Sequence, residues 1–204
     1  MIKLRKIRRI VLQAGHGGLK GERFDPGAIG PKGETENHEV TQIIGHLERI
    51  LKESGVAVLV APDARLSPSI RWVNTNCNSA DWLIEVHKDS AGKMSPSLRR
   101  RMGVYYLGGD KGSQDVADAM ARQFILAGAN PTSWSRPDTV SRHGSLGWIR
   151  DTKYVAHLVE CGFMQDDLSD NEDKFYAVAL AAAICACLSV KFDVVWWLQK
   201  EGIK

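Results

Sequence analysis

Apolar and polar positions follow two different periods along the chain. Short runs rich in β-branched residues predict buried strands at residues 8–14, 55–60, 81–87, 102–107 and 155–163. Apolar residues spaced three and four apart predict helices at residues 35–54, 67–79, 115–127 and 170–190. Because strands and helices alternate, we expect a three-layer α/β fold, in which a mostly parallel, twisted sheet of about five or six strands carries helices on both faces.

Two segments predict loops, and the end of the chain predicts a tail. Residues 19–33 are rich in Gly and Pro, and residues 130–150 lack a regular apolar period. A chain of 204 residues that is 44% hydrophobic provides one packed core and leaves little room for two. We expect the domain to comprise residues 1–190, and residues 191–204, which carry Trp196-Trp197, to form a short helix or a linker.

The charge and hydropathy patterns argue against two classes of partner. The net charge is +3, and the basic clusters at residues 3–9 and 99–101 contain no interleaved aromatic residues, so we expect no nucleic-acid partner. The apolar runs are too short for a signal-peptide core, and the Ala-rich run 175–190 is typical of a buried helix. We therefore expect a chain made in the cytoplasm without a signal peptide, with no insertion into a membrane.

Histidines stand at the ends of two predicted strands. His16 follows the first strand within Gly15-His16-Gly17-Gly18, and His87 ends the third. Open α/β sheets place their ligands at the carboxyl ends of the strands, so both imidazoles are expected at one sheet edge. The glycines lack the Gly-x-Gly-x-x-Gly spacing of a dinucleotide-binding loop. The remaining histidines are expected to have structural roles; they are His38, His46, His143 and His157.

Carboxylates stand close to the same edge. Glu34, Glu36 and Glu39 open the first long helix, where acids also complement the helix dipole, and Glu160 lies near the end of the last strand. Two neutral imidazoles and one carboxylate form a common catalytic zinc site that leaves a position for water. A further carboxylate that does not touch the metal can accept a proton from that water.

In their order, these motifs resemble the zinc-dependent N-acetylmuramoyl-L-alanine amidases of phage endolysins and bacterial autolysins, the amidase-3 family. The resemblance covers nearly the whole chain. It is carried by Ala14-Gly15-His16-Gly17-Gly18, Asp25-Pro26-Gly27-Ala28-Ile29-Gly30, Glu36, Arg71, Asn76, Asp81, Leu83-Ile84-Glu85-Val86-His87 and Leu158-Val159-Glu160-Cys161-Gly162-Phe163.

The resemblance implies a site and a reaction. His16, Glu36 and His87 would bind one Zn²⁺ per chain, and Glu160 would be the catalytic carboxylate. Zinc-activated water would hydrolyse the amide bond between N-acetylmuramic acid and L-alanine in peptidoglycan. In the family the ligand acid precedes the first core residues of the helix, which points to Glu36; Glu39 is the alternative.

This sequence departs from the family around the second histidine. It reads Glu85-Val86-His87-Lys88-Asp89-Ser90, whereas the family more often has Ser-Ile-His followed by Ala or Asn-Ala. Lys88 is therefore a candidate for substrate contact. Arg142, in the late loop, is a second candidate, because a guanidinium group can bind the carboxylates of the peptide stem.

The resemblance also bears on partners and location. The segment between His87 and Tyr105 is short, as in family members without an autoinhibitory insertion, so no activator protein is expected. An endolysin would act on the cell wall after holin-dependent release or secretion, and the tail would be a short helix or a linker to a wall-binding module. Two other hypotheses stay open, namely another zinc peptidase on the same fold and a non-catalytic wall-binding module. The oligomeric state is open as well.

Overall fold

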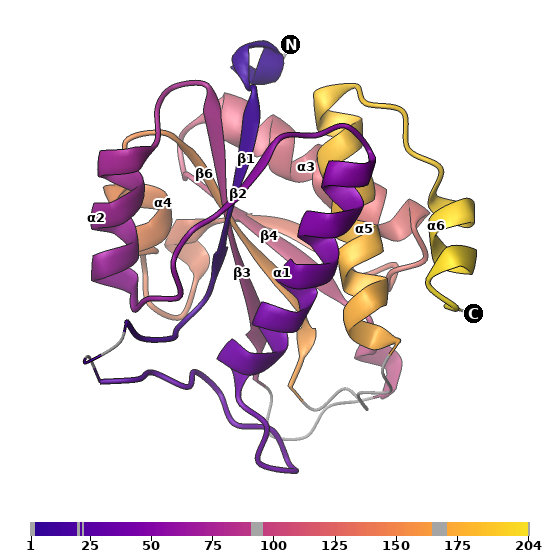
Figure 1. Ribbon diagram of the computed structural model, residues 1–204, viewed down its shortest axis with the longest axis horizontal. Helices are drawn as coiled ribbons and strands as arrows, with labels where there is room; N and C mark the ends of the chain where they lie inside the picture. The colour runs from indigo at the N-terminus through magenta and orange to yellow at the C-terminus, as the bar shows by residue number, and fades with distance from the viewer. Residues whose placement is uncertain (1–2, 20, 22, 91–95, 165–170, 204) are drawn as a thin grey trace.

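A single six-stranded sheet forms the centre of the computed structural model, which describes residues 3–19, 21, 23–90, 96–164 and 171–203. Its strands are β1 (Arg9–Ala14), β2 (Val58–Val60), β3 (Asp81–Asp89), β4 (Met102–Tyr106), β5 (Trp134–Pro137) and β6 (Val155–Phe163). They lie in the order β2-β1-β3-β6-β4-β5, and each neighbouring pair is parallel except β4 with β6 (Figure 1). The predicted α/β class with a mostly parallel sheet is confirmed.

Helices cover both faces of the sheet. They are α1 (Glu36–Glu53), α2 (Leu66–Asn76), α3 (Lys111–Leu126), α4 (Gly147–Asp151), α5 (Glu172–Leu188) and α6 (Val194–Lys200), with short 3₁₀ helices η1 (Lys3–Lys6), η2 (Pro96–Leu98) and η3 (Asp138–Val140). Figure 1 shows α1, α3 and α5 on one face and α2 and α4 on the other. Each face has its own apolar cluster, which makes the three layers that the alternation of strands and helices predicts.

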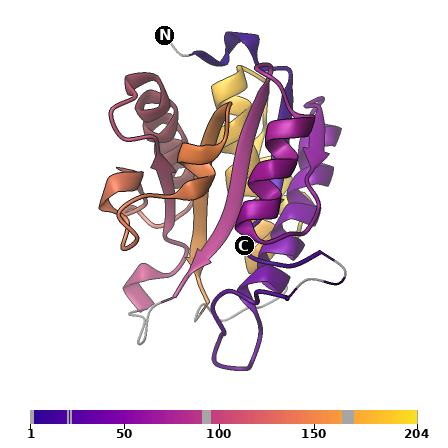
Figure 2. The same cartoon turned by 90° about the vertical axis from the view of Figure 1, so that its left-hand side faces the viewer.

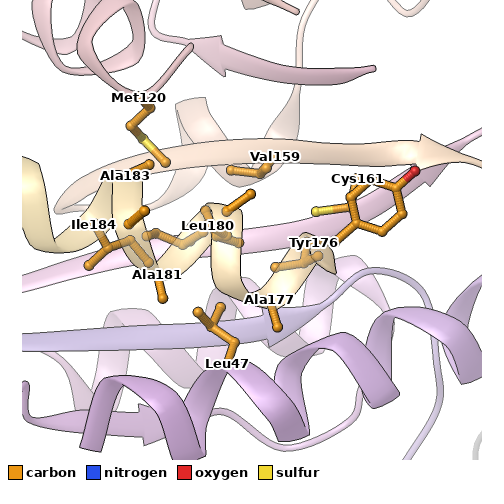
Figure 3. Packing of buried hydrophobic residues seen from close by; sticks show 14 of the residues in the cluster. Leu47, Met120, Val159, Cys161, Tyr176, Ala177, Leu180, Ala181, Ala183 and Ile184 are labelled. Carbon is orange, nitrogen blue, oxygen red and sulfur yellow. The ribbon is translucent and has the colours of Figure 1, made fainter. Parts of the chain in front are cut away.

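The Ala-rich helix α5 is buried on nearly all sides. It packs between α1 and α3 and over β6, where Ala177, Leu180 and Ala181 lie among Leu47 and Val159 (Figure 3). Small side chains let the neighbouring elements approach closely, so this helix needs no polar face. Among the described residues, no helix combines the length and the apolar character required to cross a bilayer.

Several elements differ from the predicted ones. The predicted loop 130–150 contains β5 and α4, which escape a search for periodicity because they have only four and five residues. β5 includes Pro137 and pairs on one side only, as expected for a proline in an edge strand. α3 begins four residues before the predicted start at residue 115, because the Asp110 side chain accepts a hydrogen bond from Ser113 N at 2.9 Å.

The two ends of the last helical region also qualify the predictions. The predicted start of α5 at residue 170 lies outside the described residues, and the described helix begins at Glu172. Within the tail, residues 194–200 form α6, the short helix that is one of its two predicted forms. Trp197 and Ile203 are buried in the same core as α5, so this segment packs against the domain.

Candidate metal centre

The sheet topology brings the two strand-end histidines together. β1 and β3 are parallel neighbours, and Ala14 lies opposite Val86 at their carboxyl ends. His16 therefore follows β1 at the same edge at which His87 stands on β3, and the two rings lie 5.0 Å apart between centroids at an angle of 80°. In Figure 2 the segment that leads from β1 to α1 lies below this edge. The predicted convergence is the consequence of parallel pairing.

His16 occupies an unusual backbone conformation that aims its ring into the site. Its φ is +67° and that of Gly17 is +95°, a left-handed pair that reverses the chain within two residues. Gly17 and Asp25 exchange two backbone hydrogen bonds of 2.8 and 2.9 Å, which hold the reversed chain in place. The Asp25 carboxylate lies 3.1 Å from His16 Nδ1, so His16 Nε2 is free to face the centre of the site.

Glu36 is the acid that reaches both histidines. It is the first residue of α1 after the cap Thr35, and its buried carboxylate places Oε1 2.8 Å from His87 Nδ1 and Oε2 3.2 Å from His16 Nε2. Backbone N–H groups of Ala28 and Lys88 donate to the same oxygens, at 2.9 and 3.2 Å. The carboxylate is thus held by four donors from three segments of the chain.

The charges of these three groups support one another. Burial works against the charged form of Glu36, but hydrogen bonds with His16 and His87 outweigh it and hold the pKa of this carboxyl well below its usual range. Burial likewise works against the charged imidazoles, while the Glu36 carboxylate raises the pKa of both His16 and His87. The site is therefore built to hold positive charge next to a buried carboxylate.

The donor atoms fit a metal ion. One donor atom from each of His16, Glu36 and His87 lies within 4.8 Å of the other two, and this is the group of three or more potential ligands found among the described residues. Space around the rings is kept by glycines, since a Cβ on Gly15 would lie 2.3 Å from His87 Cε1 and one on Gly27 would lie 2.5 Å from His16 Cδ2. Two imidazoles and a carboxylate suit Zn²⁺.

Glu39 and Lys88 lie on the other side of β3 and pair with each other. The Glu39 carboxylate is 2.7 Å from Lys88 Nζ, both side chains are buried, and the ammonium lies 5.5 Å from the ring centre of Tyr176. The alternative acid, Glu39, is therefore not at the histidines. The expected substrate contact of Lys88 needs correction too, because strand alternation turns Lys88 away from the face that carries His87 and into the core.

Glu160 stands beside the metal ligands without a partner of its own. It lies opposite His87 in the pairing of β3 with β6, and its Oε2 is buried and accepts no hydrogen bond from the described residues. Burial raises the pKa of Glu160 to about 7, the positive charge of His87 opposes this shift, and the nearby carboxylates of Asp89, Glu36 and Glu85 add to it. A carboxyl with such a pKa can exchange a proton at neutral pH.

Arg142 is exposed and lies in the segment between η3 and α4. Its Nε is 3.1 Å from Nε2 of His143, and its charge lowers the pKa of Tyr105, a residue whose pKa Glu160 raises. His157, in contrast, is fully buried: it accepts a hydrogen bond from Trp82 Nε1 at 2.9 Å, and burial lowers its pKa to about 4. The structure gives this histidine the structural role expected for it.

Two acids beside the centre escaped the sequence interpretation as contributors to it. Asp25 faces His16 Nδ1, and Glu85 places Oε2 3.3 Å from His87 Nε2. Asp25 belongs to the loop, where no period predicts which way a side chain points. Glu85 stands two residues before His87 on a strand, a spacing that places both side chains on one face and could have indicated the contact.

Fold and centre together define the class of this protein: an α/β protein with two histidines and a glutamate at the carboxyl edge of its sheet and a buried carboxylate beside them. The sequence model of the N-acetylmuramoyl-L-alanine amidase family, Amidase_3, matches residues 10–189, and the chain therefore belongs to this family. The predicted family and the predicted peptidoglycan amidase function are confirmed by this match.

Solved amidases share the fold. The catalytic domain of CwlV from Bacillus (Paenibacillus) polymyxa var. colistinus is 23% identical, with a TM-score of 0.67 over 91% of this chain and 100% of that one. CwlD from Clostridioides difficile, solved in complex with the GerS lipoprotein, is 19% identical, with a TM-score of 0.70 over 90% and 100%. The catalytic domain of the CD27L endolysin targeting Clostridia difficile is 17% identical, with a TM-score of 0.66 over 91% and 99%. Among curated protein sequences, none matches the chain.

Proposed function

We propose that the chain is a zinc-dependent N-acetylmuramoyl-L-alanine amidase in which His16, Glu36 and His87 bind one Zn²⁺ and Glu160 is the catalytic carboxylate. The observation that carries this proposal is the geometry of Glu36, whose two oxygens face one nitrogen of each histidine at 2.8 and 3.2 Å. A buried carboxylate between two imidazoles offers a dication one negative charge and two neutral donors, and leaves room for a water molecule. When bound, zinc polarises the scissile carbonyl and makes water acidic enough to attack at neutral pH.

Glu160 would carry the protons in this reaction. Its Oε2 has no hydrogen-bond partner among the described residues, so this oxygen is free to accept a proton from the attacking water. The same carboxyl, once protonated, donates to the nitrogen of L-alanine as the amide bond breaks. A pKa raised to about 7 by burial suits both halves of this exchange, because neither protonation state is strongly favoured at neutral pH.

The substrate and the site of action follow from the same assignment. Peptidoglycan carries peptide stems with free carboxylates, and Arg142 is an exposed guanidinium whose charge reaches the side of the site that holds Tyr105. We propose Arg142 as a contact for the stem. The fold similarity to the CD27L endolysin supports a role in cell-wall lysis, with release of the chain to the wall by a holin or by secretion. One catalytic domain, 1–190, suffices for this role.

One experiment tests the zinc assignment and the reaction together. Native protein, Glu160→Gln and Glu36→Gln are purified, their zinc content is measured, and each is incubated with intact peptidoglycan. The native chain is expected to bind one equivalent of zinc and to release new N-terminal alanine without new reducing sugar ends. Glu160→Gln should keep its zinc and lose at least about a hundredfold in rate, as expected for a general acid and base. Glu36→Gln should lose the metal.

The outcomes separate the alternatives. Full zinc stoichiometry in Glu36→Gln would show that the ligand assignment is wrong. Hydrolysis of free peptides in place of intact peptidoglycan would identify another zinc peptidase. Binding to cell walls without any release of stems by the native chain would identify a wall-binding module. The expected independence from an activator protein is tested in the same assay, since the isolated chain should be active; CwlD, solved together with GerS, is the relevant contrast.

A further inference from the structure

The ring of His87 is held on three sides, and one of these contacts is a buried carboxylate that the proposed reaction does not use. Nδ1 lies 2.8 Å from Glu36 Oε1, while Nε2 lies 3.3 Å from Oε2 of Glu85. One side of the ring rests on the backbone of Gly15, where a Cβ would come within 2.6 Å of three ring atoms. Glu85 itself is 4% exposed. The orientation of the imidazole is therefore determined, including which nitrogen faces which carboxylate.

The two nitrogens of His87 have different surroundings. Nδ1 points at Glu36, whose second oxygen faces Nε2 of His16, so Nδ1 belongs to the set of three converging donor atoms. Nε2 points away from that set toward Glu85. A histidine that binds a metal through one nitrogen keeps its proton on the other, and an acceptor at that proton fixes the tautomer, orients the ring and makes the ligand more basic.

We infer that Glu85 is a positioning residue for the metal centre, which accepts the Nε2 proton of His87 while Nδ1 faces the metal. The inference rests on the proposed zinc site. It explains why a carboxylate is buried at this position, since a buried charge is costly unless a charged or strongly polar partner compensates it, and His87 is the partner at hand. It also gives meaning to the departure of this sequence from the serine more common in the family at the position of Glu85.

Glu85 has a counterpart on the other histidine. Asp25 lies 3.1 Å from Nδ1 of His16, on the side of the ring opposite to Glu36. Each imidazole thus has Glu36 on one nitrogen and a second carboxylate on the other. The difference is burial, because the side chain of Asp25 is 42% exposed and that of Glu85 is 5% exposed. Solvent weakens the contribution of Asp25, so Glu85 is expected to have the larger effect on zinc affinity.

Zinc affinity measures this role directly. Native protein, Glu85→Gln and Glu85→Ser are titrated with zinc against a chromophoric chelator, without any substrate. Loss of the carboxylate should weaken zinc binding by about 10- to 100-fold in Glu85→Ser. Glu85→Gln keeps an acceptor oxygen and nearly the same volume, so it should lose less. Asp81→Asn is the matched control, because Asp81 is also a buried carboxylate on β3 but pairs with Arg9 at 2.8 Å at the far end of the strand. It should lower stability and leave zinc affinity unchanged.

Histidine side-chain NMR supplies a second readout that needs only the native chain. In the zinc-loaded protein, the nitrogen shifts should identify His87 as bound through Nδ1, and its Nε2 proton should resonate far downfield, as expected for a hydrogen bond to a carboxylate. That proton signal should move upfield in Glu85→Gln. A His87 protonated at Nδ1, or an unchanged zinc affinity in a folded Glu85→Ser, would overturn the inference. A native chain that binds no zinc at all would overturn the proposed function as well, so the two failures can be told apart.

Discussion

Replacing Glu160 with glutamine is expected to stabilise the metal-free protein at alkaline pH while it removes activity. Burial raises the pKa of Glu160 to about 7, compared with 4.5 for an ordinary glutamate. Between these values the unfolded chain has lost its proton and the folded chain has kept it, so the free energy of unfolding falls as pH rises. Above pH 7 the loss is complete. A difference of 2.5 in pKa corresponds to about 3 kcal/mol.

The assay is urea unfolding in the presence of EDTA at two pH values. At pH 8, Glu160→Gln should exceed native protein by up to about 3 kcal/mol, because glutamine stays neutral in the same buried position. At pH 5 the advantage should shrink below about 1 kcal/mol, since the native carboxyl is then protonated in the folded state. A gain in stability at a catalytic position is the expected sign of a group that is kept for function.

A control of opposite sign tests the reasoning. Asp138 is a buried carboxylate whose pKa is held below its usual value, against the effect of burial, by hydrogen bonds from Gly108 and from Arg150. Asp138→Asn should therefore destabilise the protein at pH 8, by the same linkage that makes Glu160→Gln stabilising. If Glu160→Gln is less stable than native protein at pH 8, or keeps its full advantage at pH 5, the assignment of Glu160 as a buried, unpartnered carboxyl is refuted.

Three further predictions concern other positions. The pKa of His157 lies at about 4 because of burial, below the ordinary 6.5, so stability is complete above pH 6.5 and is lost as pH falls toward 4; a proton titration by NMR that gives an ordinary pKa would contradict this. Gly15→Ala should weaken zinc binding in a chelator competition, because its Cβ would collide with a ligand imidazole, whereas Gly45→Ala, in an exposed part of α1 with nothing within 4 Å, should raise the melting temperature slightly. Lys88→Met should cost about 3 kcal/mol in urea unfolding, since it strands Glu39, and the double variant with Glu39→Leu should recover most of the loss; an additive double variant would show that the two side chains do not interact.

The sequence predicted the fold and most of the site for identifiable reasons. A run of β-branched residues followed by glycines locates the end of β1, and the same pattern ending in His87 locates the end of β3. Parallel strands place such ends at one edge, so the convergence of His16 and His87 follows from topology. Short elements without a period, β5 and α4, were the parts of the fold that this reasoning could not find.

By itself, then, the sequence determined which residue types stand at the carboxyl edge of the sheet, because the apolar periods of strands and helices are local properties. Only the tertiary structure decided how the polar side chains there pair. Glu36 and Glu39 are three residues apart on one helix and share a face, so periodicity cannot separate them; the packing of α1 against β3 gives Glu36 to the histidines and Glu39 to Lys88. Glu85 reaches His87 for the same reason. The partner of a polar group depends on register and packing between distant segments, and these are set only when the chain folds.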